Sequence, residues 1–269
     1  MTSQTPQAKR HAPPAGNPVS LLRFRSRLES IAPFAVVIAL WFAVTEGGMI
    51  QPIFLPSPAR TLASLAGLLS AGFLQENLVP SVMRVAGAFA LSAAIALPLG
   101  VLSGNVPAVA RAVLPLCSFT RYLPVAALVP LCILWFGIDN AQKIAVITLG
   151  SVFQLLILIA GDTASVPQEL VEAARTFGLS KGAVVWQVVL PWAMPAIWND
   201  LRVCAGWAWS YLVLAELVAG NRGVGYFIIQ SQRYLETDRV FAGILLIGLL
   251  GLATDQIFKF SAARLFRWM

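Results

Sequence analysis

Residues 172–191 read EAARTFGLSKGAVVWQVVLP. This segment is the most polar interior stretch of a chain that is otherwise strongly apolar. Lipid does not tolerate unpaired backbone groups and charges, so a polar segment between two apolar blocks is expected at a membrane surface. Its pattern is a helix, a glycine stop and a second helix, which makes it the first candidate for an element that binds something.

The composition of the chain is that of a membrane protein. Of its 269 residues, 58% are hydrophobic and only 12% are charged, and the mean hydropathy is +0.77. Soluble globular proteins carry about 25% charged residues. The net charge of +7 does not indicate a nucleic-acid partner, because Lys and Arg concentrate at the two ends and in turns between apolar blocks.

The residue types needed for catalysis or metal binding are scarce. Cys117, Cys132 and Cys204 lie in or beside apolar segments without metal-ligand spacing, and His11 is the only histidine. We therefore expect no metal, no cofactor and no catalytic site in this chain.

A helix needs about 20 apolar residues to cross a bilayer. Blocks with few charges predict an all-α, polytopic membrane bundle of about six spans. The predicted spans lie near residues 30–47, 82–104, 116–137, 143–162, 195–218 and 239–259.

The remaining segments follow from charge and periodicity. Residues 1–28 are predicted to be a disordered, basic cytoplasmic tail, and residues 29–269 the transmembrane domain. Residues 58–76 show a 3.6-residue apolar period, which predicts an amphipathic helix on the outer surface, with Pro58 in its first turn. Six spans place both basic ends in the cytoplasm, together with the loop 163–191.

Local signals within that loop predict a helical hairpin. Ser165 followed by Gln168 has the form of a capping box for the first helix. Gly178 is the expected helix stop, and Ser180 is the expected cap of a second helix that runs towards Pro191. These signals leave two interpretations open, a docking element and an ordinary solvated loop.

The same loop resembles the EAA loop of the membrane subunits of bacterial ABC importers. The resemblance is carried by Glu172-Ala173-Ala174, by Gly178 six residues after Glu172, by Val188 ten residues later, and by Leu190-Pro191. Two further runs, PLCILWFGI at 130–138 and GWAW at 206–209, are similar to the permeases for nitrate, sulfonate, taurine and bicarbonate.

The resemblance implies a type I (MetI-like) importer fold and a mechanism. A homodimer in the bacterial inner membrane would present its loops to a pair of cytoplasmic ATP-binding subunits, and a periplasmic solute-binding protein would deliver the solute. The residues implied in ATPase coupling are Glu172, Ala173, Ala174, Gly178, Leu179, Leu190 and Pro191. The chain has no Gly-x-x-x-x-Gly-Lys-Ser/Thr phosphate loop, so ATP hydrolysis is expected on the partner.

Polar side chains in or beside the spans need a separate explanation, because charges are costly in lipid. Arg84, Arg121, Gln154 and Glu216 are candidates for a translocation pathway. The alternative is that the charged ones lie at the interface or pair with one another.

The sequence argues against two other function classes. A membrane enzyme lacks support because no His lies in a span, and an autonomous channel or carrier would not need the helical hairpin. Within the importer class, the resemblance favours a small anion, with alkanesulfonate or taurine ahead of nitrate. Relatives of similar appearance carry vitamin precursors or aromatic acids.

Overall fold

A computed structural model describes residues 18–69 and 71–267 of the chain. The chain divides into two compact units, residues 1–58 and residues 59–269. In the first unit, α1 (Pro18–Glu46) is followed by turns, and the indole N–H of Trp41 donates to the carbonyl oxygen of Pro56 at 3.0 Å. Most of the predicted disordered tail lies outside the described residues, but α1 begins at Pro18, so the predicted tail extends too far.

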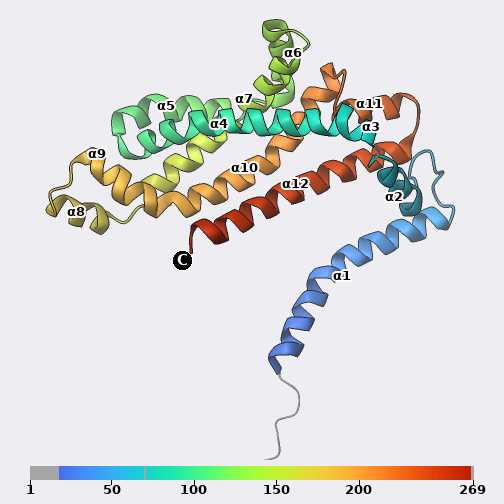
Figure 1. Cartoon of the computed structure of the whole chain (residues 1–269), viewed down its shortest axis with the longest axis horizontal. Helices are drawn as coiled ribbons and strands as arrows, with labels where there is room; N and C mark the ends of the chain where they lie inside the picture. The colour runs from blue at the N-terminus through green and yellow to red at the C-terminus, as the bar shows by residue number, and fades with distance from the viewer. Residues whose placement is uncertain (1–17, 70, 268–269) are drawn as a thin grey trace, which may run out of the picture. The chain divides into compact units, whose positions relative to one another are not determined.

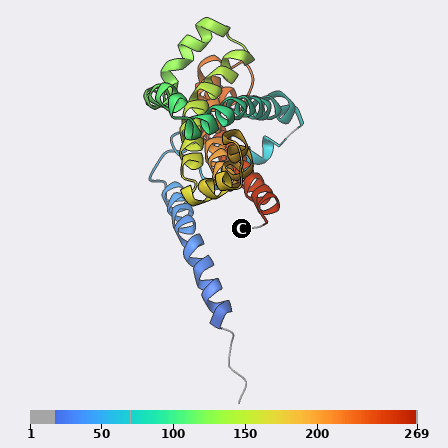
Figure 2. The same ribbon diagram turned by 90° about the vertical axis from the view of Figure 1, so that its left-hand side faces the viewer.

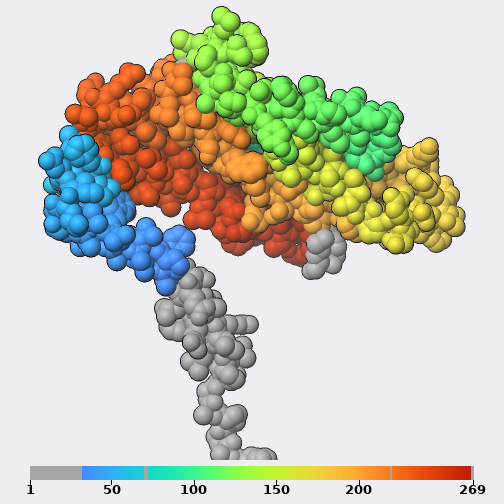
Figure 3. Space-filling model, turned by 180° about the vertical axis from the view of Figure 1, so that it is seen from behind, coloured from blue at the N-terminus to red at the C-terminus, as the bar shows by residue number. Residues whose placement is uncertain are grey.

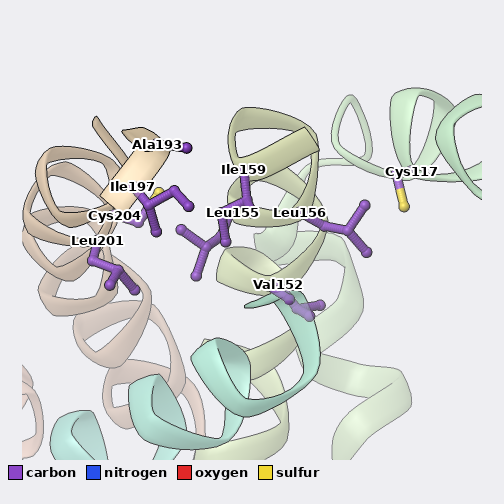
Figure 4. Packing of buried hydrophobic residues seen from close by; sticks show 10 residues of the cluster. Cys117, Val152, Leu155, Leu156, Ile159, Ala193, Ile197, Leu201 and Cys204 are labelled. Atoms are coloured by element: carbon purple, nitrogen blue, oxygen red, sulfur yellow. The ribbon is translucent and has the colours of Figure 1, made fainter. Parts of the chain in front are cut away.

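The second unit is built on long apolar helices that lie side by side (Figure 1). They are α4 (Val79–Asn105), α7 (Asn140–Ala164), α10 (Leu190–Ala219) and α12 (Thr237–Leu265). Helices α4 and α7 make the most extensive contact, since Gly100 and Gly104 let the two backbones approach closely. The largest core cluster joins α7 to α10 and also includes residues of α4 and α5 (Figure 4).

Four helices of the described residues are long and apolar enough to span a membrane. A fifth span results if α5 (Pro107–Thr120) and α6 (Val125–Phe136) form one broken span, and α1 adds a shorter apolar helix at Ala32–Glu46. The all-helical membrane bundle is thus confirmed, and the predicted third span near 116–137 is made of the end of α5 and all of α6. The axis bends by 101° between α5 and α6, where Pro124 precedes the first residue of α6.

Short helices close the two ends of the second unit. One end carries α8 (Gln168–Thr176) and α9 (Lys181–Val184), which face the viewer in Figure 2. The other end carries α2 (Pro58–Gly67), α3 (Ala71–Phe73) and α11 (Val224–Arg233). The predicted amphipathic helix begins at Pro58 as expected but ends at Gly67, well before residue 76.

Two π-helical turns precede prolines and make neighbouring helices continuous. The turn η1 (Leu74–Leu78) leads into α4 ahead of Pro80, and η2 (Val185–Val189) leads from α9 into α10 ahead of Pro191. Proline has no N–H and collides with the carbonyl four residues earlier, so a wider turn accommodates it. The predicted second helix of the hairpin does run towards Pro191, and it continues beyond this residue as α10 to Ala219.

Candidate functional site

The hairpin formed by α8 and α9 closes with a regular C-terminal capping motif. Gly178 has a φ of +86°, its N–H donates to the carbonyl of Arg175 at 2.9 Å, and the N–H of Leu179 donates to the carbonyl of Ala174 at 3.2 Å. These two bonds are those of a Schellman motif, which needs a left-handed residue at this position. The predicted glycine stop is confirmed.

The start of each hairpin helix is fixed differently. The Ser180 hydroxyl accepts a hydrogen bond from the N–H of Ala183 at 3.3 Å, as predicted for a cap. The capping box at Ser165 is wrong, because this hydroxyl donates backwards to the carbonyl of Asp162 at 2.8 Å. Pro167 precedes α8 instead, without a side-chain cap.

One face of α8 packs against the second helix of the hairpin. Ala174 is buried there with the aliphatic side chains of Val166, Val184 and Val189, and Leu179 packs against the same cluster. Of the two alanines that the sequence singled out, only Ala173 lies on the exposed face. Ala174 instead holds the two helices together.

Several side chains of α8 outside this cluster are exposed. Glu172 and Ala173 point away from it, whereas Leu170 and Phe177, four residues before and three residues after Ala174, are exposed beside it, and the Phe177 side chain is 85% exposed. Sequence reasoning missed Phe177 and Leu170, although an aromatic residue directly before the helix-stopping glycine was a visible signal. A helix at one end of the unit that exposes apolar side chains as well as an acidic one is suited to bind another protein.

A buried polar network occupies the other end of the unit. Arg84 Nη1 lies 2.7 Å from Glu216 Oε1, and the two side chains are 6% and 0% exposed. Arg84 also donates to the side-chain oxygen of Asn140 and to the carbonyl of Arg222, both at 2.8 Å. Glu216 accepts hydrogen bonds from Ser81 and from the N–H of Gly225, each at 2.8 Å.

This network connects four helices, α4, α7, α10 and α11. It also explains the glycines of the turn after α10, because a side chain at Gly223 would collide with the Glu216 carboxylate, and a Cβ at Gly225 would lie 2.7 Å from that of Glu216. Removing one partner of a buried ion pair typically costs about 3–5 kcal/mol. Of the two readings of these charges, pairing within the protein is what the structure shows for Arg84 and Glu216.

Two buried polar residues beside the network were not singled out from the sequence. Lys143 is 1% exposed and donates weakly to the carbonyl of Asp139 at 3.4 Å. Gln142 is fully buried, and within the described residues neither atom of its amide has a hydrogen-bond partner. A separate ion pair joins α10 to α12, where Arg202 Nε lies 2.6 Å from Asp255 Oδ1.

The other two pathway candidates lie outside the network. Arg121 follows α5 at the bend and is exposed, with its Nη2 donating to the Tyr122 hydroxyl at 2.9 Å. Gln154 is half-buried in the middle of α7. Among the described residues, no group of three or more His, Cys, Asp or Glu side chains could hold a metal ion.

Comparison with known proteins identifies relatives over most of the chain. The model of the family described as "Binding-protein-dependent transport system inner membrane component" matches residues 96–267. The taurine transport system permease protein of Escherichia coli (strain K12) is 32% identical over 244 residues, which cover 89% of each chain. The bicarbonate transport system permease protein of Synechococcus elongatus is 29% identical over 265 residues, which cover 94% of each chain.

A solved structure has the same fold. An inward-facing conformation of the MetNI methionine ABC transporter superposes with a TM-score of 0.58 at 20% identity, covering 71% of this chain and 98% of that chain. At this identity the likeness concerns the fold alone.

Proposed function

This chain belongs to the family of binding-protein-dependent transport system inner membrane components, and on that premise we propose that it carries a small anion across the bacterial inner membrane. The resemblance inferred from the EAA loop is confirmed. The family supplies the transmembrane permease subunit of ABC importers, which is not itself catalytic and works with an ATP-binding subunit and a solute-binding protein.

The proposed solute is a small organic or inorganic anion such as an alkanesulfonate, taurine or nitrate. Support comes from the relatives, whose names refer to taurine and bicarbonate transport. The chain's own support is an exposed arginine, Arg121, in an apolar setting. Selection among such anions belongs to the binding protein that delivers them.

The coupling element in this proposal is the hairpin of α8 and α9, with Glu172, Ala173 and Gly178, together with Leu190 and Pro191 at the start of α10. The observation that carries it is mechanical: α8 is clamped onto α9, and α9 continues through η2 into α10 without a helix break. A force on the exposed face of α8 therefore acts directly on a membrane-spanning helix. Ala174 and Leu179 contribute by holding α8 in place.

We propose that the hairpin and both chain ends face the cytoplasm and that the functional unit is a homodimer with a pair of ATP-binding subunits. The basic residues at the two ends support this orientation. The end of α12 runs towards the hairpin side, since the indole N–H of Trp198, early in α10, donates to the carbonyl of Phe258 at 3.1 Å. The hairpin and the basic C-terminal end of α12 then meet the same membrane surface.

We propose different roles for the four residues that the sequence suggested for the translocation pathway. Arg84 and Glu216 are buried against each other in this structure, and we propose that they hold the outer end of the bundle closed in this state. Arg121 and Gln154 are proposed to line the pathway itself.

Transport assays in proteoliposomes test the proposed function. The permease is reconstituted with its ATP-binding subunit and binding protein, and uptake of taurine, an alkanesulfonate, nitrate and bicarbonate is measured with and without ATP. We expect ATP-dependent uptake of at least one of these anions and none without the ATP-binding subunit. Flux that persists through the permease alone would favour the autonomous carrier instead.

A further inference from the structure

The break between α5 and α6 exposes polar groups. Arg121 is exposed, and the neighbouring Tyr122 is 76% exposed, with the guanidinium 4.8 Å from the centre of the Tyr122 ring. In the part of the chain that the structure describes, no carboxylate lies within ion-pair distance of Arg121. Arg84, Arg202 and Arg239, by contrast, each pair with a carboxylate.

The level of this break in the bilayer follows from the packing of α5. The helix starts directly after α4, at the end where Gly104 of α4 meets Thr163 of α7. Its 14 residues rise about 21 Å. Near its far end, Cys117 packs in one cluster with Val152 and Leu156, which lie at the middle of α7 (Figure 4).

Arg121 comes one turn after Cys117, and its N–H donates to the Cys117 carbonyl at 3.0 Å. The break therefore lies close to mid-depth, level with the centre of a helix that spans the membrane. From this level α6 stands out from the bundle, as the space-filling view shows (Figure 3).

A guanidinium and a broken helix at mid-depth cannot face lipid. Non-helical backbone is tolerated at this depth only where protein covers it or where it lines a water-filled cavity. Intramembrane arginines likewise face a bundle interior or an aqueous pathway. The exposed side of the break must therefore face such an interior, which a single copy of the chain does not supply.

We propose that Arg121 and Tyr122 form an anion-binding site at mid-depth, on the pathway between two copies of the chain. This site rests on the proposed function, which supplies the second copy and the anionic solute. Each copy contributes one guanidinium and one phenol, so the paired site carries two positive charges. It takes oxyanions of the sulfonate, nitrate or bicarbonate type.

The chemistry of the break suits such a ligand. A guanidinium presents N–H donors in a planar fork that matches two oxygens of an oxyanion. The hydrogen bond from Nη2 to the Tyr122 hydroxyl orients the guanidinium and leaves its other donors for a ligand. The ring of Tyr122 covers one face of the guanidinium and stabilises its charge.

The first test compares Arg121→Gln with Arg111→Gln in the reconstituted importer. Arg111 is an exposed arginine near the start of the same helix, so its replacement removes an equal charge away from the break. We expect Arg121→Gln to lower ATP-dependent anion uptake by about 10- to 100-fold, the scale of a lost charged hydrogen bond. Arg121→Lys should retain part of the uptake, and Arg111→Gln nearly all of it.

Uptake by Arg121→Gln at the wild-type rate would overturn the site. Absence of ATP-dependent uptake in the wild-type importer would instead overturn the proposed function, so the two failures are distinguishable.

A second measurement does not depend on transport. In a background with Cys117, Cys132 and Cys204 replaced, Tyr122→Cys is exposed to sulfonatoethyl methanethiosulfonate, which is anionic, and to its trimethylammonium counterpart. We expect faster modification by the anionic reagent and loss of this preference when Arg121→Gln is added.

Leu252→Cys, an exposed position near the middle of α12, serves as the control and should react with neither reagent. If Tyr122→Cys is as unreactive as Leu252→Cys, the break faces lipid and the proposal is wrong.

Discussion

Gly178 fixes the shape of the hairpin through its backbone. Its φ of +86° lies in the left-handed region, where a side chain costs about 1–2 kcal/mol and a β-branched one is a clear outlier. We expect Gly178→Val to distort the end of α8 and to lower solute-stimulated ATPase activity of the complex, while membrane insertion is unchanged.

Gly182→Val provides the control for this prediction. Gly182 lies four residues further along the same hairpin, its φ is not positive, and no atom stands within 4 Å of a Cβ placed there. The variant should retain nearly full coupled activity. Equal loss of activity in both variants would show that the left-handed conformation of Gly178 is not the reason.

Single residues were predictable where the signal is local. Gly178 and Ser180 act within a few residues of their own position, so glycine and serine chemistry alone identified the stop and the cap. The partners of Arg84 were not predictable, because Glu216 is 132 positions away and only the fold brings the two together. The burial of Lys143 and Gln142 was not predictable, because it depends on helices that are distant in the sequence and pack around them.

Contact between α4 and α7 depends on a small residue at the crossing. A Cβ on Gly104 would lie 2.6 Å from the backbone oxygen of Ala160, which cannot move aside without distorting α7. Overpacking of this kind costs about 1–3 kcal/mol. We expect Gly104→Leu to lower the thermal unfolding midpoint of the permease in detergent.

The matched control is Gly87→Leu on the same helix. No atom lies within 4 Å of a Cβ at this position, and leucine is a better helix former than glycine by roughly 1 kcal/mol. Its unfolding midpoint should stay the same or rise. A fall as large as that of Gly104→Leu would contradict the close crossing.

At the scale of elements, hydropathy predicted which blocks form helices but not how they continue. The predicted third span at 116–137 falls on two helices, because Pro124 and the turn before it divide this largely apolar block. At Pro191, by contrast, the π turn before the proline keeps the helix continuous. Proline thus had opposite effects at two sites, and the packing around each decides which occurs.

In the second unit, the α8–α9 hairpin and the buried Arg84–Glu216 network lie at opposite ends of the bundle (Figure 1). Helix α7, with 25 residues, spans about 37 Å between the end with Arg84 and the end with the hairpin. Helix α10 follows the hairpin and carries Glu216 near its far end, so one continuous helix connects the hairpin to the buried ion pair. The family and the hairpin were predictable from the sequence. The connection that α10 makes between the hairpin and Glu216 is visible only in the folded structure.

In the proposed mechanism, a separate ATP-binding subunit binds the exposed surface of α8. Co-purification tests this contact most directly. Tagged permease carrying Phe177→Ser with Glu172→Lys is compared with wild type and with Tyr234→Ser, which removes an aromatic side chain that is 71% exposed at the opposite end of the unit. We predict that the ATP-binding subunit co-purifies with wild type and Tyr234→Ser and is lost from the α8 variant. Undiminished recovery of the ATP-binding subunit with the α8 variant would show that this subunit does not bind the exposed surface of α8.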